Sequence, residues 1–433
     1  MNTRLTAGCA LLLSALAQQA SAFDLNDAWR AAQGYNSDYA AARADLDAGR
    51  ELTVQGRAQL LPQVGLSGNY SHNTPATPSG MNSYDSSGYG VQLSQPLFDV
   101  AKYAAWQKGK IGSSQAELAF VASEQQLLVT VARAYFDVLL AQDTLAANRA
   151  SKKAYATQLA QAKTSFELGT ATITDTHEAQ AGYDGAVAKE IAAESQLEIS
   201  RNNLLRLTGL SPDAIQPLKD SLPLDTPTPA TLEGWIQLAV ANSPSLKSAE
   251  QSVELAKAGI TEKRANQLPT ITLNAGYNEA RSNAFGSVPV TRGNSVGVTV
   301  SLPLFAGGGI DSQVREAVAR KDAAADKLES ARRQLREDVR RAWLGVTNGA
   351  ALVRAQQQLV LSANSKVEST RLGKEVGIRT NLDLLQAEQA YYDAVTSLAT
   401  ARYDYLTARL QLAQAAGTLD EALLQQVNQA VRR

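Results

Sequence analysis

Two aspartates that follow short glycine turns are the side chains best placed to do chemistry in this sequence. Asp175 comes six residues after Gly169, and Asp383 comes six residues after Gly377. An Asp beside a turn can cap the helix that starts there, because its side-chain oxygen accepts a hydrogen bond from an unpaired backbone N–H. The same carboxylate attracts cations where several copies converge. From the sequence alone, the capping role is favoured for both residues.

Residues suited to catalysis or to metal binding are scarce. His72 and His177 are the two histidines, and neither has a cysteine or a second histidine at ligand spacing, so no metal site is expected. The glycines at 307–309 lack the lysine and the spacing of a phosphate loop. No Ser/His/Asp or Cys/His set can be assembled, and we therefore expect neither an enzyme nor a cofactor.

Residues 1–22 are expected to be a secretory signal peptide. Arg4 supplies the positive charge, an apolar run around Leu12 the centre, and Ala20–Ala22 the small-residue cleavage site. The only cysteine, Cys9, would be removed by this cleavage. The chain has 41 basic and 42 acidic residues, a balance that gives no reason to expect a nucleic-acid partner.

The rest of the chain contains one unit used twice. Leu25–Tyr70 aligns without a gap on Leu232–Tyr277, an offset of 207 residues, and an offset of 208 pairs Gly169 with Gly377. Such a constant offset indicates an internal duplication. The predicted parts are a first repeat at 23–210, a connector at 211–231, a second repeat at 232–417 and a C-terminal segment at 418–433.

Proline positions and heptad spacing predict a long helical hairpin in each repeat. None of the 13 prolines lies between residues 97 and 211 or after 303. Apolar residues recur every seven positions in both stretches, as in a coiled-coil seam: Val121, Leu128 and Tyr135, then Val339, Val346 and Val353. The first long helix, from about 99 to 168, would span about 105 Å. Returning helices are expected at 175–208 and 383–416, with a further helix at 25–61.

A pair of strands is expected in each repeat, at 63–72 and 88–97 and again at 270–278 and 294–303. Apolar residues alternate there with small or polar ones, and each segment has the length of a tilted membrane-spanning strand. Four strands cannot close a barrel, and open edges in hydrocarbon leave backbone groups unpaired. Three copies would provide about twelve strands, enough for an aqueous passage, so we expect a trimer.

The layout of the whole mature chain resembles the TolC family of outer-membrane factors. The resemblance rests on Leu61–Gln63, Pro96–Asp99, Phe166–Gly169 with Ile173–Asp175, and Val376–Thr380 with Leu382–Asp383. It implies an α+β, mainly α fold: duplicated helical hairpins in a coiled-coil α-barrel, and four transmembrane strands per protomer in a shared 12-stranded β-barrel. It also implies a mixed equatorial region at 211–231 and 418–433.

The function implied by the resemblance is an exit duct in the outer membrane of a Gram-negative cell, with a long periplasmic extension. Such ducts are homotrimers in outer-membrane lipid, and they serve drug efflux or type I protein secretion with a periplasmic adaptor and an inner-membrane ABC or RND-type pump. The alternative is a structural or adhesive trimeric coiled coil. In adhesins, however, the strands usually sit together at the C-terminus, whereas here they form two internal pairs.

The resemblance also assigns roles to residues at the hairpin tips. Asp383 would face the channel axis and form the constriction with Gln386, which stands where relatives have a second acidic residue. One carboxylate ring in place of two predicts a pore that is less cation-selective than in two-ring relatives. The turns expected to contact an adaptor contain Gly169, Thr170, Gly377 and Ile378.

A gating network is implied beside this constriction. In the family, an arginine after the second turn bonds a Thr-Asp pair at the first turn, and Arg379, Thr174 and Asp175 match that set. Lys374 replaces a tyrosine of well-known members. We expect Lys374 to pair with Asp175, which would make the closed state sensitive to salt.

Overall fold

The computed structural model describes residues 23–74, 83–212, 215–219, 222–225, 227–283 and 288–431. The expected signal peptide at 1–22 lies outside these residues, as do parts of the 211–231 connector and of the two loops between paired strands. The chain divides into two compact units. Unit 1 comprises Met1–Ala41, Ala122–Ser243 and Gln334–Arg433, and unit 2 comprises Ala42–Val121 and Pro244–Arg333.

Each repeat begins with two short helices rather than one. They are α2 (Leu25–Tyr35) and α3 (Ser37–Ala58), then α6 (Leu232–Asn242) and α7 (Pro244–Ala265). The single helix expected over 25–61 is interrupted at Asn36, whose extended backbone (ψ 121°) ends α2 and whose side chain accepts a hydrogen bond from the N–H of Tyr39. The second repeat is interrupted 207 residues later, at Ser243, just before a proline that can begin a helix but not continue one.

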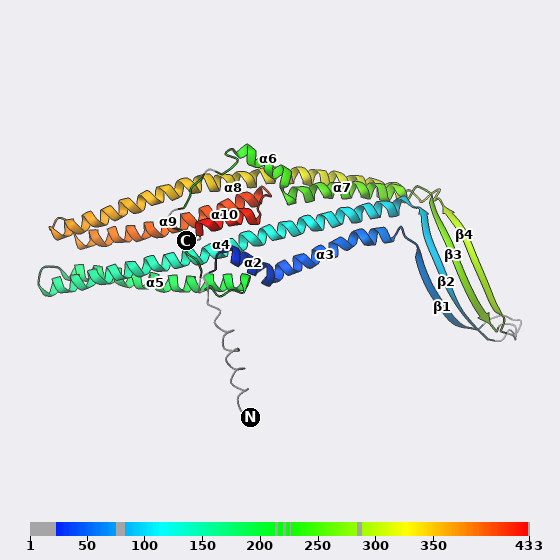
Figure 1. The fold of residues 1–433 in the computed structure, drawn as a ribbon, viewed down its shortest axis with the longest axis horizontal. Helices are drawn as coiled ribbons and strands as arrows, with labels where there is room; N and C mark the ends of the chain where they lie inside the picture. The colour runs from blue at the N-terminus through cyan, green and yellow to red at the C-terminus, as the bar shows by residue number, and fades with distance from the viewer. Residues whose placement is uncertain are drawn as a thin grey trace, which may run out of the picture. The chain divides into compact units, whose positions relative to one another are not determined.

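Unit 2 contains a four-stranded antiparallel sheet whose strands lie side by side in chain order (Figure 1). The strands are β1 (Gln63–Asn73), β2 (Tyr84–Phe98), β3 (Thr270–Ser282) and β4 (Val290–Ser301). β2, β3 and β4 begin or end further into the connecting loops than the alternation predicted. β4 ends at Ser301, two residues before Pro303, whose missing N–H cannot join a ladder.

The two hairpins of the sheet have the same register. Gln63 lies opposite Ser94 in the first, and Thr270 lies opposite Ser301 in the second, so both partners are displaced by 207 residues. The duplication is therefore visible in the hydrogen-bonded pairing as well as in the sequence.

One face of the sheet is apolar and open. Val64, Leu66, Val296, Val298 and Val300 alternate along the edge strands, and each of these side chains is more than half exposed, with Val296 at 79%. Soluble monomers rarely expose a contiguous apolar surface of this kind, and such a patch marks a membrane or protein contact.

The same face carries a charged cluster around Glu279, near the strand ends that lead into the loops. Glu279 is buried, with its carboxylate 2.9 Å from Arg281 Nη2 and 3.0 Å from Arg292 Nε. The Tyr89 hydroxyl donates to the same carboxylate at 2.9 Å. A buried carboxylate is thus fully paired by two cations and a phenol, as the cost of burying a charge requires.

The long helices are α4 (Val100–Glu167), α5 (Ile173–Thr208), α8 (Gly309–Glu375) and α9 (Asn381–Ala415), and a short α10 (Glu421–Val431) follows. None of the helices in the part of the chain that the structure describes is long and apolar enough to cross a membrane.

The core of unit 1 joins α4 and α9 to both ends of the described chain. Tyr135 and Phe136 on α4 are fully buried, and the Phe136 ring lies 6.1 Å from the ring of Tyr403 on α9. The Tyr135 hydroxyl lies 3.0 Å from the Gln216 carbonyl oxygen and 3.4 Å from that of Phe23. Asn428 of α10 accepts a hydrogen bond from the N–H of Leu25 at 3.0 Å, which fixes α2. This core anchors the long hairpins.

Candidate functional site at the hairpin tips

The two hairpin tips, both in unit 1, have the same backbone conformation. Gly169 and Gly377 adopt positive φ values of 73° and 79°, a region that favours glycine. In the first tip, the N–H of Thr170 donates to the Ser165 carbonyl at 2.9 Å; in the second, Ile378 donates to Gly373 at 2.9 Å. Because Ser165 and Gly373 are 208 residues apart, the two turns are equivalent in the duplication.

A capping box starts the returning helix at each tip. Thr172 and Thr380 are the N-cap residues, and the aspartates Asp175 and Asp383 are the third residues of α5 and α9. Each Asp accepts hydrogen bonds from the N–H and the hydroxyl of its threonine, 2.9 Å from both at Thr380. The helices start two residues earlier than expected, and the aspartates belong to the cap without being the N-cap residue.

These hydrogen bonds favour the charged form of both carboxylates. Bonds from Thr172 hold the pKa of Asp175 below its usual value, and bonds from Thr380 do the same for the pKa of Asp383, helped by the nearby Arg379 charge. Asp383 is partly exposed, and Gln386, one helical turn further on, is exposed on α9.

The expected pairing of Lys374 with Asp175 is not formed in this chain. The Lys374 ammonium donates to the side-chain oxygen of Asn381 at 2.7 Å instead. Both capping bonds from Thr172 go to Oδ2 of Asp175, which leaves the acceptor capacity of its Oδ1 outside the capping box. The lysine therefore ties α8 to the start of α9 within one hairpin, although its charge still lowers the pKa of Asp175.

Arg379 also stays within its own tip. Its side chain packs on Gly373, where an added Cβ would lie 2.7 Å from Arg379 Cγ. Within the described residues of this chain, no hydrogen bond or ion pair joins Arg379 to Thr174 or Asp175. Thr174 is exposed. A latch of these three residues would thus have to form between copies of the chain.

A buried polar cluster near the tips was missed by the sequence analysis. Gln158 of α4 donates a short hydrogen bond to Glu388 of α9, and both are at least 95% buried. Arg371 of α8 lies 3.7 Å from the same carboxylate. The Tyr155 hydroxyl donates to the Leu385 carbonyl at 3.4 Å. This cluster joins the first hairpin to the second.

Burial is the largest influence on the pKa values of Glu388 and Lys374. It raises the pKa of Glu388, against the hydrogen bond from Gln158 and the charge of Arg371. It also lowers the pKa of Lys374, against the charges of Glu388 and Asp175. The sequence signal was a glutamate between apolar seam residues, Leu384 and Tyr391, but its partner is 230 residues away in the chain.

Replacing Glu388 with Gln is expected to flatten the pH dependence of stability. The pKa of Glu388 is higher in the folded chain than in the unfolded chain, so the unfolded chain loses this proton first as the pH rises. The contribution of Glu388 to the free energy of unfolding is therefore greatest at low pH, and it declines as the pH rises from the unfolded pKa through the folded pKa. A tenfold difference in proton affinity between the folded and unfolded chains corresponds to about 1.4 kcal/mol. Melting temperatures of the wild type and of Glu388→Gln, measured between pH 4 and pH 8, would test this prediction. The same dependence of melting temperature on pH in the two proteins would contradict it.

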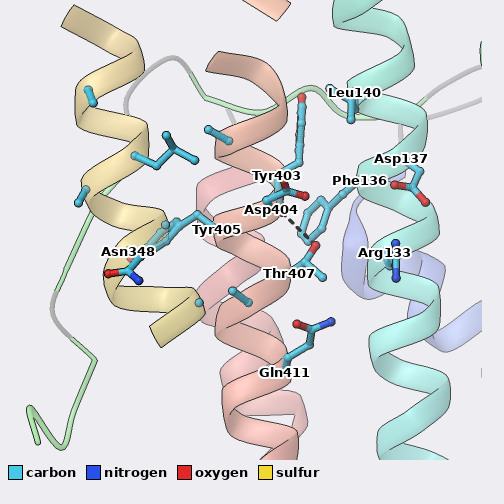
Figure 2. A pocket seen from close by; sticks show the side chains of 17 residues that line it. Arg133, Phe136, Asp137, Leu140, Asn348, Tyr403, Asp404, Tyr405, Thr407 and Gln411 are labelled. Carbon is cyan, nitrogen blue, oxygen red and sulfur yellow. Dashed lines mark hydrogen bonds between the residues drawn. The ribbon is translucent and has the colours of Figure 1, made fainter. Parts of the chain in front are cut away.

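A groove in unit 1 lies between α4, α8 and α9 (Figure 2). Its polar lining includes Arg133 and Asp137 on α4, Asn348 on α8, and Tyr403, Asp404, Tyr405, Thr407 and Gln411 on α9. None of the described residues that line it is a histidine, cysteine or serine. In the same described part of the chain, no three acidic, histidine or cysteine side chains are grouped to hold a metal. The groove offers no catalytic set.

Comparison with known proteins covers both repeats. The sequence model of the family described as outer membrane efflux protein matches residues 29–210 and 235–418. The alkaline protease secretion protein AprF of Pseudomonas aeruginosa is 36% identical over 431 residues, 97% of this chain and 89% of AprF. The outer membrane protein TolC of Vibrio cholerae is 34% identical over 394 residues, 90% of this chain and 89% of TolC.

The fold is shared with a solved structure. The outer membrane protein VceC of Vibrio cholerae matches with a TM-score of 0.78 over 91% of this chain and 96% of VceC, at 19% identity. The likeness to the TolC family inferred from the tip motifs and the duplication is confirmed. The chain belongs to the outer membrane efflux protein family: it is a channel protein of the outer membrane, of the kind used in efflux and type I secretion, and not an enzyme.

Proposed function

We propose that three copies of this chain form one exit duct, which receives drugs or polypeptides from an inner-membrane pump and releases them outside the cell. The observation that carries the proposal is the sheet of unit 2, which has an exposed apolar face and two unpaired edges. In hydrocarbon each unpaired backbone group costs several kcal/mol, so the edges must be closed by other strands. Three four-stranded sheets would close into a barrel of about twelve strands.

Aromatic side chains border the apolar face at both ends. Tyr70 and Tyr89 lie toward the loops between paired strands, and Phe98 and Phe305 lie at the opposite end, next to α4 and α8. All four are exposed, Phe305 at 89%. Aromatic bands at both interfaces are typical of outer-membrane strands, so this arrangement supports placement of the sheet in the outer membrane with the loops outside.

The hairpin tips are suited to partner binding. Gly169, Thr170, Gly377 and Ile378 are exposed, and Ile378 is 78% accessible. Other apolar residues around the two turns are also open: Phe166, Leu168, Ile173, Leu372, Val376 and Leu382. Such a surface fits the tip of a periplasmic adaptor protein, which would connect the duct to an ABC or RND-type pump.

The same tips would form the gate. Asp383 and Gln386 line the constriction, and Arg379 of one copy bonds Thr174 and Asp175 of the next. Lys374 stays on Asn381 and stiffens the second hairpin, since that bond is made within the chain.

Planar-bilayer recording and native mass measurement of the purified protein would test the proposal together. We expect a trimer with stepwise ionic conductance. An adhesive coiled coil would form a trimer without conductance, and a stable folded monomer without conductance would refute the duct. The protease secretion relative and the TolC relative leave both kinds of cargo within the proposal.

A further inference from the structure

The charged cluster around Glu279 lies on the face of the sheet that the proposed function places against lipid. Along β4 the apolar run of this face ends at Val296, and Asn294 and Arg292 follow toward the loop. Arg292 lies opposite Glu279 of β3. Strand residues rise about 3.3 Å each, so Arg292 lies about 13 Å beyond Val296. Charges cost little at the edge of a bilayer and much at its centre, which puts this cluster at the level of the lipid headgroups.

Glu279 holds two arginines in fixed positions. One oxygen of its carboxylate, Oε1, accepts hydrogen bonds from Nε and Nη2 of Arg281, at 3.3 and 2.9 Å. The other oxygen, Oε2, accepts from Nε of Arg292 at 3.0 Å and from the Tyr89 hydroxyl at 2.9 Å. Because Glu279 is buried, with 4% of its surface exposed, the carboxylate orients both guanidinium groups and is not itself open to a ligand.

Both arginines keep N–H groups for a ligand. Their side chains are 55% exposed at Arg281 and 66% at Arg292. A guanidinium has five N–H donors, and within the described residues Arg292 uses only its Nε and Arg281 its Nε and Nη2. Two cations on one carboxylate leave a net positive charge in this cluster. Asp85, in phase with Tyr89 on β2, has its own partner in His72, whose Nδ1 lies 2.7 Å away.

We propose that Arg281 and Arg292 bind a phosphate group in the headgroup of a glycolipid of the outer leaflet, whose acyl chains cover the apolar face below. The inference rests on the proposed function, which places the loop end of the sheet at the outer surface of the outer membrane. The outer leaflet of that membrane consists largely of glycolipid with phosphorylated sugars. Guanidinium groups suit phosphate because their paired N–H groups match its oxygens.

The apolar surface beside the arginines favours a lipid over free phosphate. Val296 and Val298 are 79% and 58% exposed on the same face. A free phosphate would use the same N–H donors and leave these side chains uncovered. A lipid would cover them while its headgroup occupies the arginines, so both parts of this surface are used only by a lipid.

Native mass spectrometry of the purified protein in detergent, titrated with lipid A, would test the site. We expect one lipid molecule per chain to bind through its phosphates. The same lipid after enzymatic removal of its phosphates should bind about 25-fold more weakly, since each arginine near a membrane surface contributes about fivefold. Inorganic phosphate should displace the intact lipid only at a much higher concentration.

Arg292→Gln tests the site with the least damage to the fold, because Arg281 and Tyr89 still bond the buried Glu279. We expect this variant to bind intact lipid A about fivefold more weakly and to bind the dephosphorylated lipid as the wild type does. The matched control is Arg336→Gln, which removes the same charge from an exposed position on α8 and should bind intact lipid A as the wild type does.

A triple variant removes the buried charge together with both partners. Glu279→Gln with Arg281→Gln and Arg292→Gln leaves no unpaired carboxylate, and it should lose about 25-fold in affinity for intact lipid A and none for the dephosphorylated lipid. The comparison of the two lipids on the wild-type protein does not depend on the folding of any variant.

The outcomes separate this site from the proposed function. Equal binding of the two lipids to a conducting trimer, or the same loss in Arg336→Gln as in Arg292→Gln, would overturn the lipid site alone. Displacement of intact lipid A by inorganic phosphate at an equal concentration would assign the arginines to free phosphate instead. A protein that neither conducts nor binds lipid A would overturn the site and the duct together.

Discussion

Replacing Asp383 with Asn is expected to reduce the preference of the channel for cations about tenfold at low salt. In the proposed trimer, three Asp383 carboxylates at roughly 8 Å would each attract a cation by ~0.5 kcal/mol in water, and about 1.4 kcal/mol corresponds to a factor of ten. The asparagine keeps an oxygen for the Thr380 capping bond, so the change removes charge without removing the cap. Reversal potentials across a bilayer with unequal salt would measure the effect.

The matched control is Asp175→Asn, which alters the equivalent capping box in the first repeat. If Asp383 alone faces the axis, this second variant should retain the wild-type preference. The difference should shrink in 1 M salt, where charges are screened within about 3 Å. Because hydrogen bonds lower the pKa of Asp383, the preference should also persist below the pH at which an ordinary carboxylate is neutralised. Unchanged selectivity in Asp383→Asn would remove this residue from the axis.

Replacing Tyr135 with Ala is expected to lower the free energy of unfolding by about 3–5 kcal/mol, the usual cost of removing a buried aromatic ring. The side chain is fully buried in unit 1, and its hydroxyl reaches the carbonyl oxygens of Phe23 and Gln216. The loss should therefore reach beyond α4 to the segments around Phe23 and Gln216. Denaturant unfolding followed by circular dichroism would measure it.

Tyr135→Phe separates the ring from the hydroxyl. This variant keeps the packing against Phe136 and removes only the bonds to the two carbonyls, so a loss of about 1–3 kcal/mol is expected. Equal losses in the two variants would mean that the hydrogen bonds, and not the packed ring, hold this core together.

Much of the fold could be predicted because it depends on local pattern and on the duplication. The heptad residues Val339, Val346 and Val353 are buried to 1% exposure or less, as the seam predicted. Tyr135 is buried likewise, whereas Val121 of the same seam is 39% exposed. Heptad spacing indicates a helix face but not where along a long helix a partner covers it.

The candidate site was predictable only where it is local. The glycine turns and the aspartates beside them follow from short motifs, because turn and cap chemistry act over a few residues. The contact between Gln158 and Glu388 spans 230 residues, and no pattern within one helix reports it. The predicted ion pair between Lys374 and Asp175 is absent within the chain, where Lys374 bonds Asn381 instead, because the sequence gives no measure of how far Lys374 lies from either residue.

The shared backbone of the two hairpin tips has a consequence for how such a gate can evolve. In the proposed trimer six tips would meet, three from the first repeat and three from the second. A single substitution in the gene therefore changes three of the six tips. Asp383 and Asp175 occupy equivalent caps, yet Gln386 corresponds to Glu178 in the other kind. Because the two repeats are joined in one chain, one substitution changes the charge at three positions of the pore. In a ring of six identical short chains, the same substitution would change the charge at all six.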